Sequence, residues 1–246
     1  MAPEPRRIER PRHPAEMGLL TRTVHGAIKF ASWLVLALIF SILLEWAGMF
    51  FFWRDEGAAH SRAMLARELS YLNEDLRQSL LVSHPAQFAA RSGEALYHYL
   101  FEWTHIVDLL QWLKTPQRPQ DSWLRLLLRV LVLPAIDYVT AAMTITQVFG
   151  VRLAVLVLAM PVFVLFGLVA ITDGLVHRDL RRWGGGWESS FVYHHAKRLL
   201  LPLPVAMWIV YLCLPVSVHP NLVILPFALL FGLALGITAA TFKKYL

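Results

Sequence analysis

Residues 153–171 read LAVLVLAMPVFVLFGLVAI, an uncharged run of nineteen residues that decides the fold class of this chain. An α-helix rises about 1.5 Å per residue, so about 20 residues cross the hydrocarbon core of a bilayer, which is about 30 Å thick. Pro161 lies in the middle of the run and predicts a kink, because proline removes a backbone donor. We therefore expect residues 153–171 to cross a membrane as a kinked helix.

The composition of the 246 residues supports this interpretation. Hydrophobic residues make up 57% of the chain and charged residues 16%, against about 25% charged in soluble domains. The mean hydropathy is +0.51. These values exclude a disordered chain, a collagen-like fibre and an ordinary soluble domain. The one cysteine, Cys213, excludes a disulfide within the chain.

Three further apolar segments predict helices of the same kind, at residues 26–53, 199–218 and 222–241. The fold class we predict is all-α: a polytopic helical membrane protein with about four transmembrane helices and a helical extramembrane insertion after the first. The predicted organisation has four parts, namely a basic cytoplasmic tail at 1–25, the first transmembrane helix at 26–53, a helical periplasmic or interfacial region at 54–149, and three transmembrane helices with a basic loop at 150–246.

The distribution of charge predicts how these helices are threaded, because Lys and Arg collect on the cytoplasmic side of membrane proteins. The tail 1–25 is rich in arginine, and the loop 172–198 has five Lys/Arg against three Asp/Glu. Residues 54–121 have seven Lys/Arg against nine Asp/Glu and are net acidic. We therefore expect a bacterial inner-membrane protein with both termini in the cytoplasm and residues 54–121 in the periplasm.

Residues 122–149 are assigned to the membrane interface as an amphipathic segment. Arg125, Arg129 and Asp137 interrupt the apolar pattern, and one charge at mid-bilayer costs about 2.5–3.5 kcal/mol on insertion scales. A crossing by this segment would also place the two basic ends of the chain on opposite sides. Four crossings are therefore favoured over five.

Residues 54–121 are polar but have helical periodicity. An apolar stripe recurs at steps of four, three, four and four residues, formed by Leu65, Leu69, Leu72, Leu76 and Leu80. A second helical run is predicted over residues 86–114. The two helices are expected to pack as a hairpin or to lie against partner proteins.

Two acidic residues near the apolar segments admit more than one role. Glu45 lies about two turns from the outer end of the first span, where we expect an interface position; a protonated state and an ion pair inside a bundle are the alternatives. Asp137 is expected to act as a helix cap or as an ion-pair partner of Arg129 or Arg152, with a place in a proton path as the alternative.

The stretch DLRRWGGGWESSFVYHHAKR, residues 179–198, is the most distinctive in the chain. Three glycines permit a sharp turn, and Glu188 and Ser189 suit the first turn of a following helix. We expect a turn between two interfacial helices. An anion site made by exposed amides is the alternative, although the spacing matches neither common phosphate-binding glycine motif.

Histidines in the same region raise the hypothesis of a metal site. His194 and His195 are adjacent, so on a helix they point about 100° apart and do not form an i, i+4 ligand pair. We therefore expect no metal site and no cofactor.

The last apolar segment carries a row of small residues at every fourth position, formed by Ala228, Gly232, Gly236 and Ala240. Such a row lets another helix approach closely. We expect it to pack on the third span, 199–218, of the same chain, with dimerisation as the alternative.

Through residues 179–198 the chain resembles the integrating conjugative element membrane protein family. The likeness is carried by Gly184, Gly185, Gly186, Glu188, Ser189, Tyr193, His194, His195, Lys197 and Arg198. It extends over most of the chain as a basic tail, an early span, a polar helical middle and three later apolar runs. Trp187 stands where the family pattern has a further basic residue, which weakens an anion-binding role for the turn.

The resemblance implies a structural or accessory inner-membrane component of a conjugative, type IV secretion-like DNA-transfer apparatus. It implies no catalytic residue, and we expect no enzyme. A small membrane transporter and a membrane-assembly factor are the alternatives. The implied partners are the lipid bilayer and other conjugative-transfer membrane proteins, and we expect no direct contact with nucleic acid.

Overall fold

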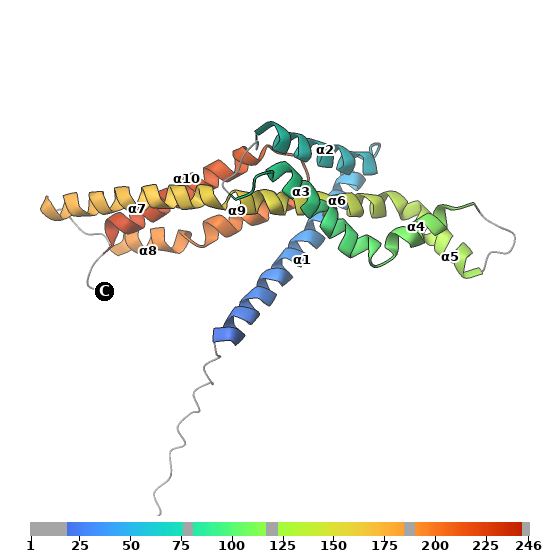
Figure 1. Ribbon diagram of the computed structural model, residues 1–246, viewed down its shortest axis with the longest axis horizontal. Helices are drawn as coiled ribbons and strands as arrows, with labels where there is room; N and C mark the ends of the chain where they lie inside the picture. Colours follow the sequence, from blue (N-terminus) through green and yellow to red (C-terminus); the bar gives the residue numbers. More distant parts are fainter. Residues whose placement is uncertain (1–18, 76–80, 117–122, 185–189, 243–246) are drawn as a thin grey trace, which may run out of the picture. The chain divides into compact units, whose positions relative to one another are not determined.

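The computed structural model describes residues 19–75, 81–116, 123–184 and 190–242 (Figure 1). Within these ranges the regular elements are all helices, and no strand occurs. The chain divides into two units, residues 1–36 and residues 37–246. The described part of the first unit is the beginning of helix α1, and most of its side chains are exposed. The all-α class is therefore confirmed for the described residues.

The helices follow one another with short connections. They are α1 (Leu19–Phe51), α2 (Ala58–Asp75), α3 (Pro85–Tyr97), the π-helical turn η1 (His98–Glu102), α4 (Ile106–Lys114), α5 (Trp123–Val132), the 3₁₀ turn η2 (Leu133–Ala135), α6 (Ile136–Leu158), α7 (Met160–Trp183), α8 (Ser190–Leu199), α9 (Pro202–Cys213) and α10 (Pro220–Thr241). Proline lies in the first two positions of α3, α7, α9 and α10. Its missing N–H costs nothing there, because the first amides of a helix have no intrahelical partner.

Four helical stretches are long and apolar enough to cross a membrane: Thr23–Phe51, Arg125–Trp183, Phe191–Cys213 and Pro220–Thr241. Their number agrees with the sequence prediction. Two boundaries were predicted wrongly. Helix α1 begins at Leu19, inside the range 1–25 that is predicted as a basic tail. The run 153–171 is shared between α6 and α7, so Pro161 helps to start a helix and does not kink one.

Two predicted segments, residues 86–114 and residues 172–198, each consist of more than one helix. The run predicted over residues 86–114 consists of α3, η1 and α4, because His105 takes a left-handed conformation with φ of 57° and ends the first helix. The predicted loop 172–198 is helical up to Trp183 and again from Ser190. The two helices agree with the expectation of a helix on each side of the glycines, whereas their position at the membrane interface stays a prediction.

Residues 122–149 do not form a single helix. Helix α5 is amphipathic, whereas the first half of α6 packs against other helices. From Ala141 to Val151 most side chains of α6 are buried or half-buried. Helices α2 and α3 cover α6, so its side chains meet protein, and the interfacial position of residues 122–149 stays a prediction.

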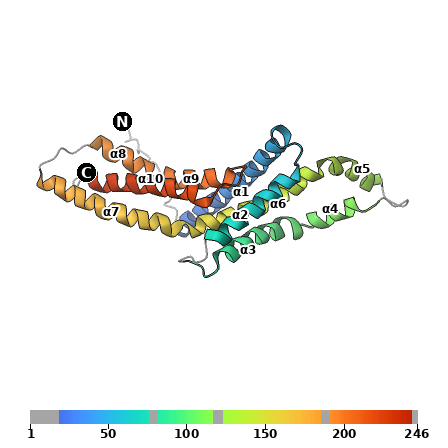
Figure 2. The ribbon, with the colours of Figure 1, turned by 90° about the horizontal axis from the view of Figure 1, so that it is seen from above.

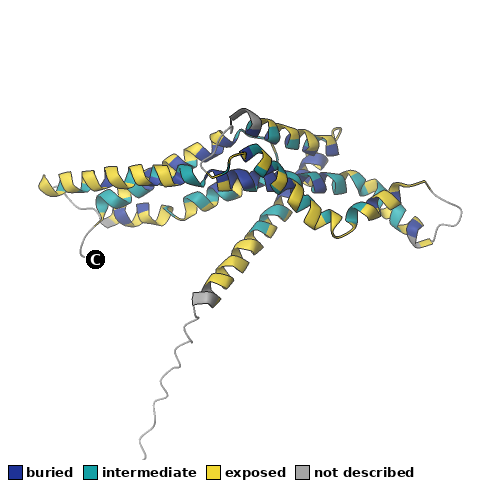
Figure 3. Cartoon of the chain, in the orientation of Figure 1, coloured by how far each residue is buried: buried dark blue, intermediate teal, exposed yellow. Residues whose placement is uncertain are grey.

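The second unit contains two groups of packed helices. Helices α7, α8 and α9 pack against α10, whereas α2 and α3 pack against α6. Figures 1 and 2 show α6 and α7 following one another in nearly the same direction, with one group along each. Burial is concentrated around α6, whereas α7 carries many exposed residues (Figure 3). Val164, Leu168, Val169 and Val176 of α7 are 57–67% exposed. An apolar surface of this extent is typical of a helix that meets lipid or another protein.

Candidate functional site

A buried ion pair joins α2 to α6. Arg152 Nη2 lies 2.7 Å from Glu68 Oε1, and Arg152 Nε donates to the same oxygen at 3.0 Å. Both side chains are 1% exposed. The hydroxyl of Tyr211 donates to the second carboxylate oxygen, Oε2, at 3.3 Å. Both oxygens of a fully buried carboxylate are therefore hydrogen-bonded, as a buried charge requires.

The same guanidinium group holds the end of α9 and the turn that follows it. Arg152 Nη1 donates to the carbonyl oxygens of Tyr211 at 3.2 Å and Leu214 at 2.6 Å, and Nη2 donates to that of Val216 at 2.8 Å. The last carbonyls of a helix lack intrahelical donors, and the guanidinium supplies them. We call Glu68, Arg152, Tyr211 and these carbonyl groups the Arg152 cluster. Through it, α6 is hydrogen-bonded both to α2 and to the 214–219 turn.

No local pattern in the sequence predicted the Arg152 cluster. An ion pair between Arg152 and Asp137 was one of the predictions, but Asp137 is exposed in the first turn of α6 and Arg152 is buried. Arg152 does border an uncharged run, and a charge in that position needs a partner. That signal indicated a partner but not which one, because Glu68 lies 84 residues away in the sequence.

A second buried acidic residue, Glu45, links α1 to α2 through a side-chain contact. Glu45 is 0% exposed, and its Oε1 lies 3.1 Å from Nδ1 of His60. The ring of His60 stacks on Trp53 at 4.0 Å with an interplanar angle of 18°. The expected interface position of Glu45 is therefore wrong, and the alternative of a pair inside a bundle describes it. The second carboxylate oxygen is buried with no hydrogen-bond partner among the described residues.

The arginines of α5 contact the end of α4. Arg125 is 7% exposed and donates through Nη2 to the carbonyl of Trp112 at 2.8 Å, with its guanidinium 4.7 Å from the centre of the Trp112 ring. Arg129 Nη1 donates to the carbonyl of Thr115 at 3.2 Å. Cations near a helix C-terminus interact favourably with its dipole. Arg129 therefore contacts α4 and does not form the expected pair with Asp137.

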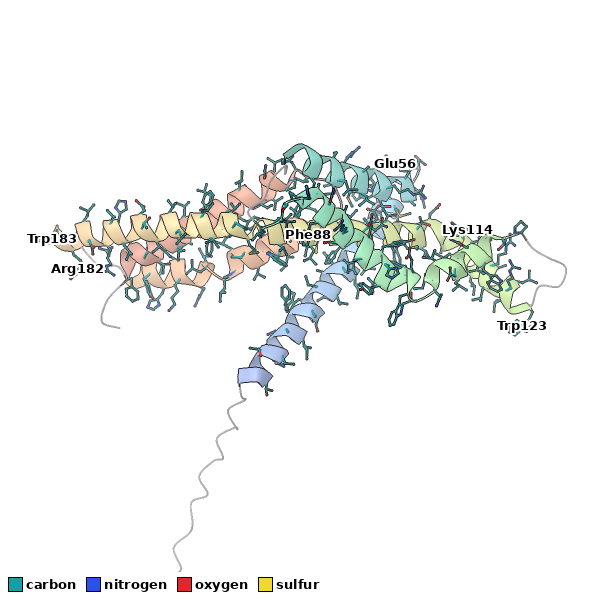
Figure 4. All side chains as sticks on the ribbon, viewed as in Figure 1. Glu56, Phe88, Lys114, Trp123, Arg182 and Trp183 are labelled. Carbon is teal, nitrogen blue, oxygen red and sulfur yellow. The ribbon has the colours of Figure 1, made fainter. Side chains whose placement is uncertain are left out.

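The 179–198 motif is divided between two helices and residues outside the described ranges. Gly184 follows α7, and its N–H donates to the carbonyl of Leu180 at 3.0 Å. Gly185, Gly186, Glu188 and Ser189 lie outside the described residues, so the turn and the anion-site alternative stay predictions. Figure 4 shows Arg182 and Trp183 at the end of α7, where both are exposed.

The described part of the motif in α8 has one buried aromatic residue and an exposed polar surface. Tyr193 is 7% exposed, packs 6.1 Å from the Phe242 ring, and lies under the ammonium group of Lys197 at 5.6 Å. His194 and His195 are exposed. His195 Nδ1 lies 2.9 Å from the carbonyl oxygen of Phe191. Within the described residues no three His, Cys, Asp or Glu side chains form a group that could hold a metal ion.

The small-residue row of α10 lies against α7 and not against the expected third span. A Cβ added to Gly232 would meet Phe166 at 3.5 Å, and one added to Gly236 would meet the Ala170 carbonyl oxygen at 3.3 Å. Ala228 is 0% exposed, and the Ala240 nitrogen is 3.2 Å from a Cβ built on Gly174. Gly174 is thus the residue of α7 that allows this close approach, and it was not among the residues predicted from the sequence.

Comparison with protein families gives one match. Residues 52–243 match the family model described as DtrJ-like, IncC plasmid conjugative DNA transfer protein DtrJ-like. No curated protein and no solved structure matches the chain. The matched range begins directly after α1 and includes both the Arg152 cluster and the 179–198 motif. The expected association with conjugative DNA transfer is confirmed, whereas the link to an integrating element stays a prediction.

Proposed function

The chain belongs to the DtrJ-like family of conjugative DNA transfer proteins, and from this membership we propose that it is a structural or accessory inner-membrane component of a type IV secretion-like apparatus. The resemblance of residues 179–198 supports the finer proposal that the apparatus is that of an integrating conjugative element. We propose no catalytic role. The charged clusters around Arg152, Glu45 and Arg125 all join one helix to another, which suits a scaffold.

The proposed threading rests mainly on the Arg152 cluster. That cluster joins α2 to the turn 214–219, as expected if both lie on the periplasmic side. Near the C-terminal end of α7, Arg181 Nη2 donates to the carbonyl of Ala240, near the end of α10. Arg152 and Arg181 are 29 positions apart (181 − 152), or about 44 Å at 1.5 Å per residue. A bilayer with its head groups is about 40–45 Å thick.

In this threading α1 crosses outward, α2 to α5 and α6 up to Arg152 lie in the periplasm, and the chain from Arg152 to the end of α7 crosses inward. The chain crosses outward again after residue 199, within the candidate stretch Phe191–Cys213, and α10 returns, so this threading places both termini in the cytoplasm. The alternating directions follow the charge distribution predicted from the sequence.

The end of α7 and the helix α8 form the proposed contact platform, which is made of the exposed residues Arg182, Trp183, His194, Lys197 and Arg198. A basic residue near an anionic leaflet contributes about 1 kcal/mol of attraction, and Trp183, at 92% exposed, suits the head-group layer. We propose that the platform meets the lipid surface and other transfer proteins, and that it does not bind DNA directly.

Charge reversal on the platform tests this function. The triple variant Arg182→Glu, Lys197→Glu and Arg198→Glu should insert and accumulate but transfer DNA less often, measured as transconjugants per donor. Arg181 is left intact because it contacts α10. The matched control is a single reversal at the exposed Arg67 of α2.

A photo-reactive amino acid at Phe191, which is 70% exposed, should cross-link to other transfer proteins in cells. Wild-type transfer by the triple variant, together with no cross-link to any transfer protein, would contradict the proposal.

A further inference from the structure

A cavity of about 580 Å³ opens between α2, α3, α4 and α6. It shares no lining residue with the Arg152 cluster or with the platform. Its volume lies within the range of small-molecule sites, about 300–1,000 Å³. Much of its wall is apolar and is formed by Leu65, Leu69, Val107, Leu110 and Met143. The cavity therefore has the size and the apolar walls of a ligand site.

The charged residues that line the cavity are both cations. Arg62 comes from α2 and Lys114 from the end of α4, where Figure 4 labels it. In the part of the chain that the structure describes, no carboxylate lines the cavity, and neither cation has an ion-pair partner. Residues 54–121 as a whole are net acidic, with seven Lys/Arg against nine Asp/Glu. The cavity is thus a positive site on an otherwise acidic segment.

A neutral hydrogen-bond donor lines the same cavity as these cations. Tyr97 lines the same cavity, and partial burial, together with the charge of Glu102, raises the pKa of its phenol above the ordinary value of 10.0. The hydroxyl group therefore stays protonated at physiological pH and is able to donate to an anion. Gln111 and Gln147 add amide groups to the lining.

We propose that this cavity binds an anionic amphiphile, with its acyl chain against the apolar wall and its phosphate or carboxylate head group at Arg62 and Lys114. An inorganic anion would leave the apolar wall uncovered, and an uncharged lipid would leave both cations unpaired. A protein partner needs about 800 Å² of surface on each side, which is more than a cavity between four helices offers.

Two sources share this chemistry, namely a phospholipid of the membrane and a free fatty acid. The phospholipid source rests on the proposed membrane location, whereas the binding chemistry does not. Native mass spectrometry of the full chain in an uncharged maltoside detergent distinguishes a bound phospholipid from a bound fatty acid. The probes are dioleoyl phosphatidylglycerol and oleate, and the comparison probes, with the same chains but no net charge, are dioleoyl phosphatidylcholine and monoolein.

The wild-type chain should retain phosphatidylglycerol, oleate or both, in preference to the probes without net charge. The double variant Arg62→Ala with Lys114→Ala should weaken this binding about tenfold or more, because a hydrogen bond to a charged group contributes at least that factor. Its control is Arg67→Ala with Arg91→Ala, which removes the same charge from exposed positions that do not line the cavity.

A second variant tests the volume without changing the charge. Ala66 lines the cavity and is exposed, so Ala66→Trp should fill it and abolish binding while the chain still folds. Ala63→Trp, on the same helix outside the cavity, is the control. Absence of bound amphiphile, equal retention of the uncharged probes, or unchanged binding by Ala66→Trp would overturn the proposal. Those outcomes leave the proposed transfer role intact, because that role is tested separately by counting transconjugants per donor.

Discussion

Replacing Arg152 by methionine tests how much the Arg152 cluster stabilises the helices. At 2.7 Å and an effective dielectric constant of about 20, the gross attraction between the two charges is about 6 kcal/mol. Desolvation costs several kcal/mol for each ion, so the intact pair contributes little net free energy. Arg152→Met removes one partner and leaves Glu68 buried without a counter-charge, which costs about 3–5 kcal/mol. Three carbonyl oxygens also lose their donor, so we expect the upper part of this range.

The assay is thermal unfolding of the purified full chain in an uncharged detergent, followed by tryptophan fluorescence. Each kcal/mol shifts the Tm of a chain of 150–250 residues by about 2–4 °C, so Arg152→Met should lower the Tm by about 6–20 °C. The control Arg182→Met, at an exposed position, should change stability by less than about 0.5 kcal/mol.

The double variant Arg152→Met with Glu68→Leu should recover part of the loss, because a buried pair replaced by apolar residues leaves no uncompensated charge. A Tm of Arg152→Met within about 2 °C of the wild type, or no recovery in the double variant, would refute the reasoning.

Three further predictions concern the threading, the close packing of α7 on α10, and the pair formed by Glu45 and His60. Alkaline phosphatase fused after Lys114 should be active and the same fusion after Arg198 inactive; reversed activities would contradict the threading. Gly174→Ala should lower stability by about 1–3 kcal/mol, because its Cβ would lie 2.5 Å from a backbone oxygen of α10. Gly167→Ala, whose Cβ would lie 3.4 Å from Leu235 Cδ2 in ordinary van der Waals contact, should cost less, and equal Tm values would count against the helix contact. Glu45→Ala should destabilise by about 1–3 kcal/mol because its histidine partner on α2 loses a buried hydrogen bond, and an unchanged Tm would show that this pair contributes nothing.

Only part of the candidate site could be predicted from the sequence. The row from Ala228 to Ala240 predicted a close helix approach, because small residues expose the backbone along one face. It did not identify α7 as the neighbour, since the row describes one surface and Gly174 provides the other. The cavity between α2, α3, α4 and α6 gave no sequence signal, because its two cations lie 52 positions apart (114 − 62) and look like ordinary surface residues.

The amino-acid sequence by itself determined the helical class and the number of apolar helices, and the resemblance of residues 179–198 to a known family indicated the association with conjugative transfer. Hydropathy and periodicity are local properties, so a window of about 20 residues contains them. Only the tertiary structure decided which charges meet. Glu68 and Arg152 are 84 positions apart, and their contact depends on how α2 and α6 are rotated and packed. That rotation is set by the fit of all the neighbouring side chains together, which no local pattern contains.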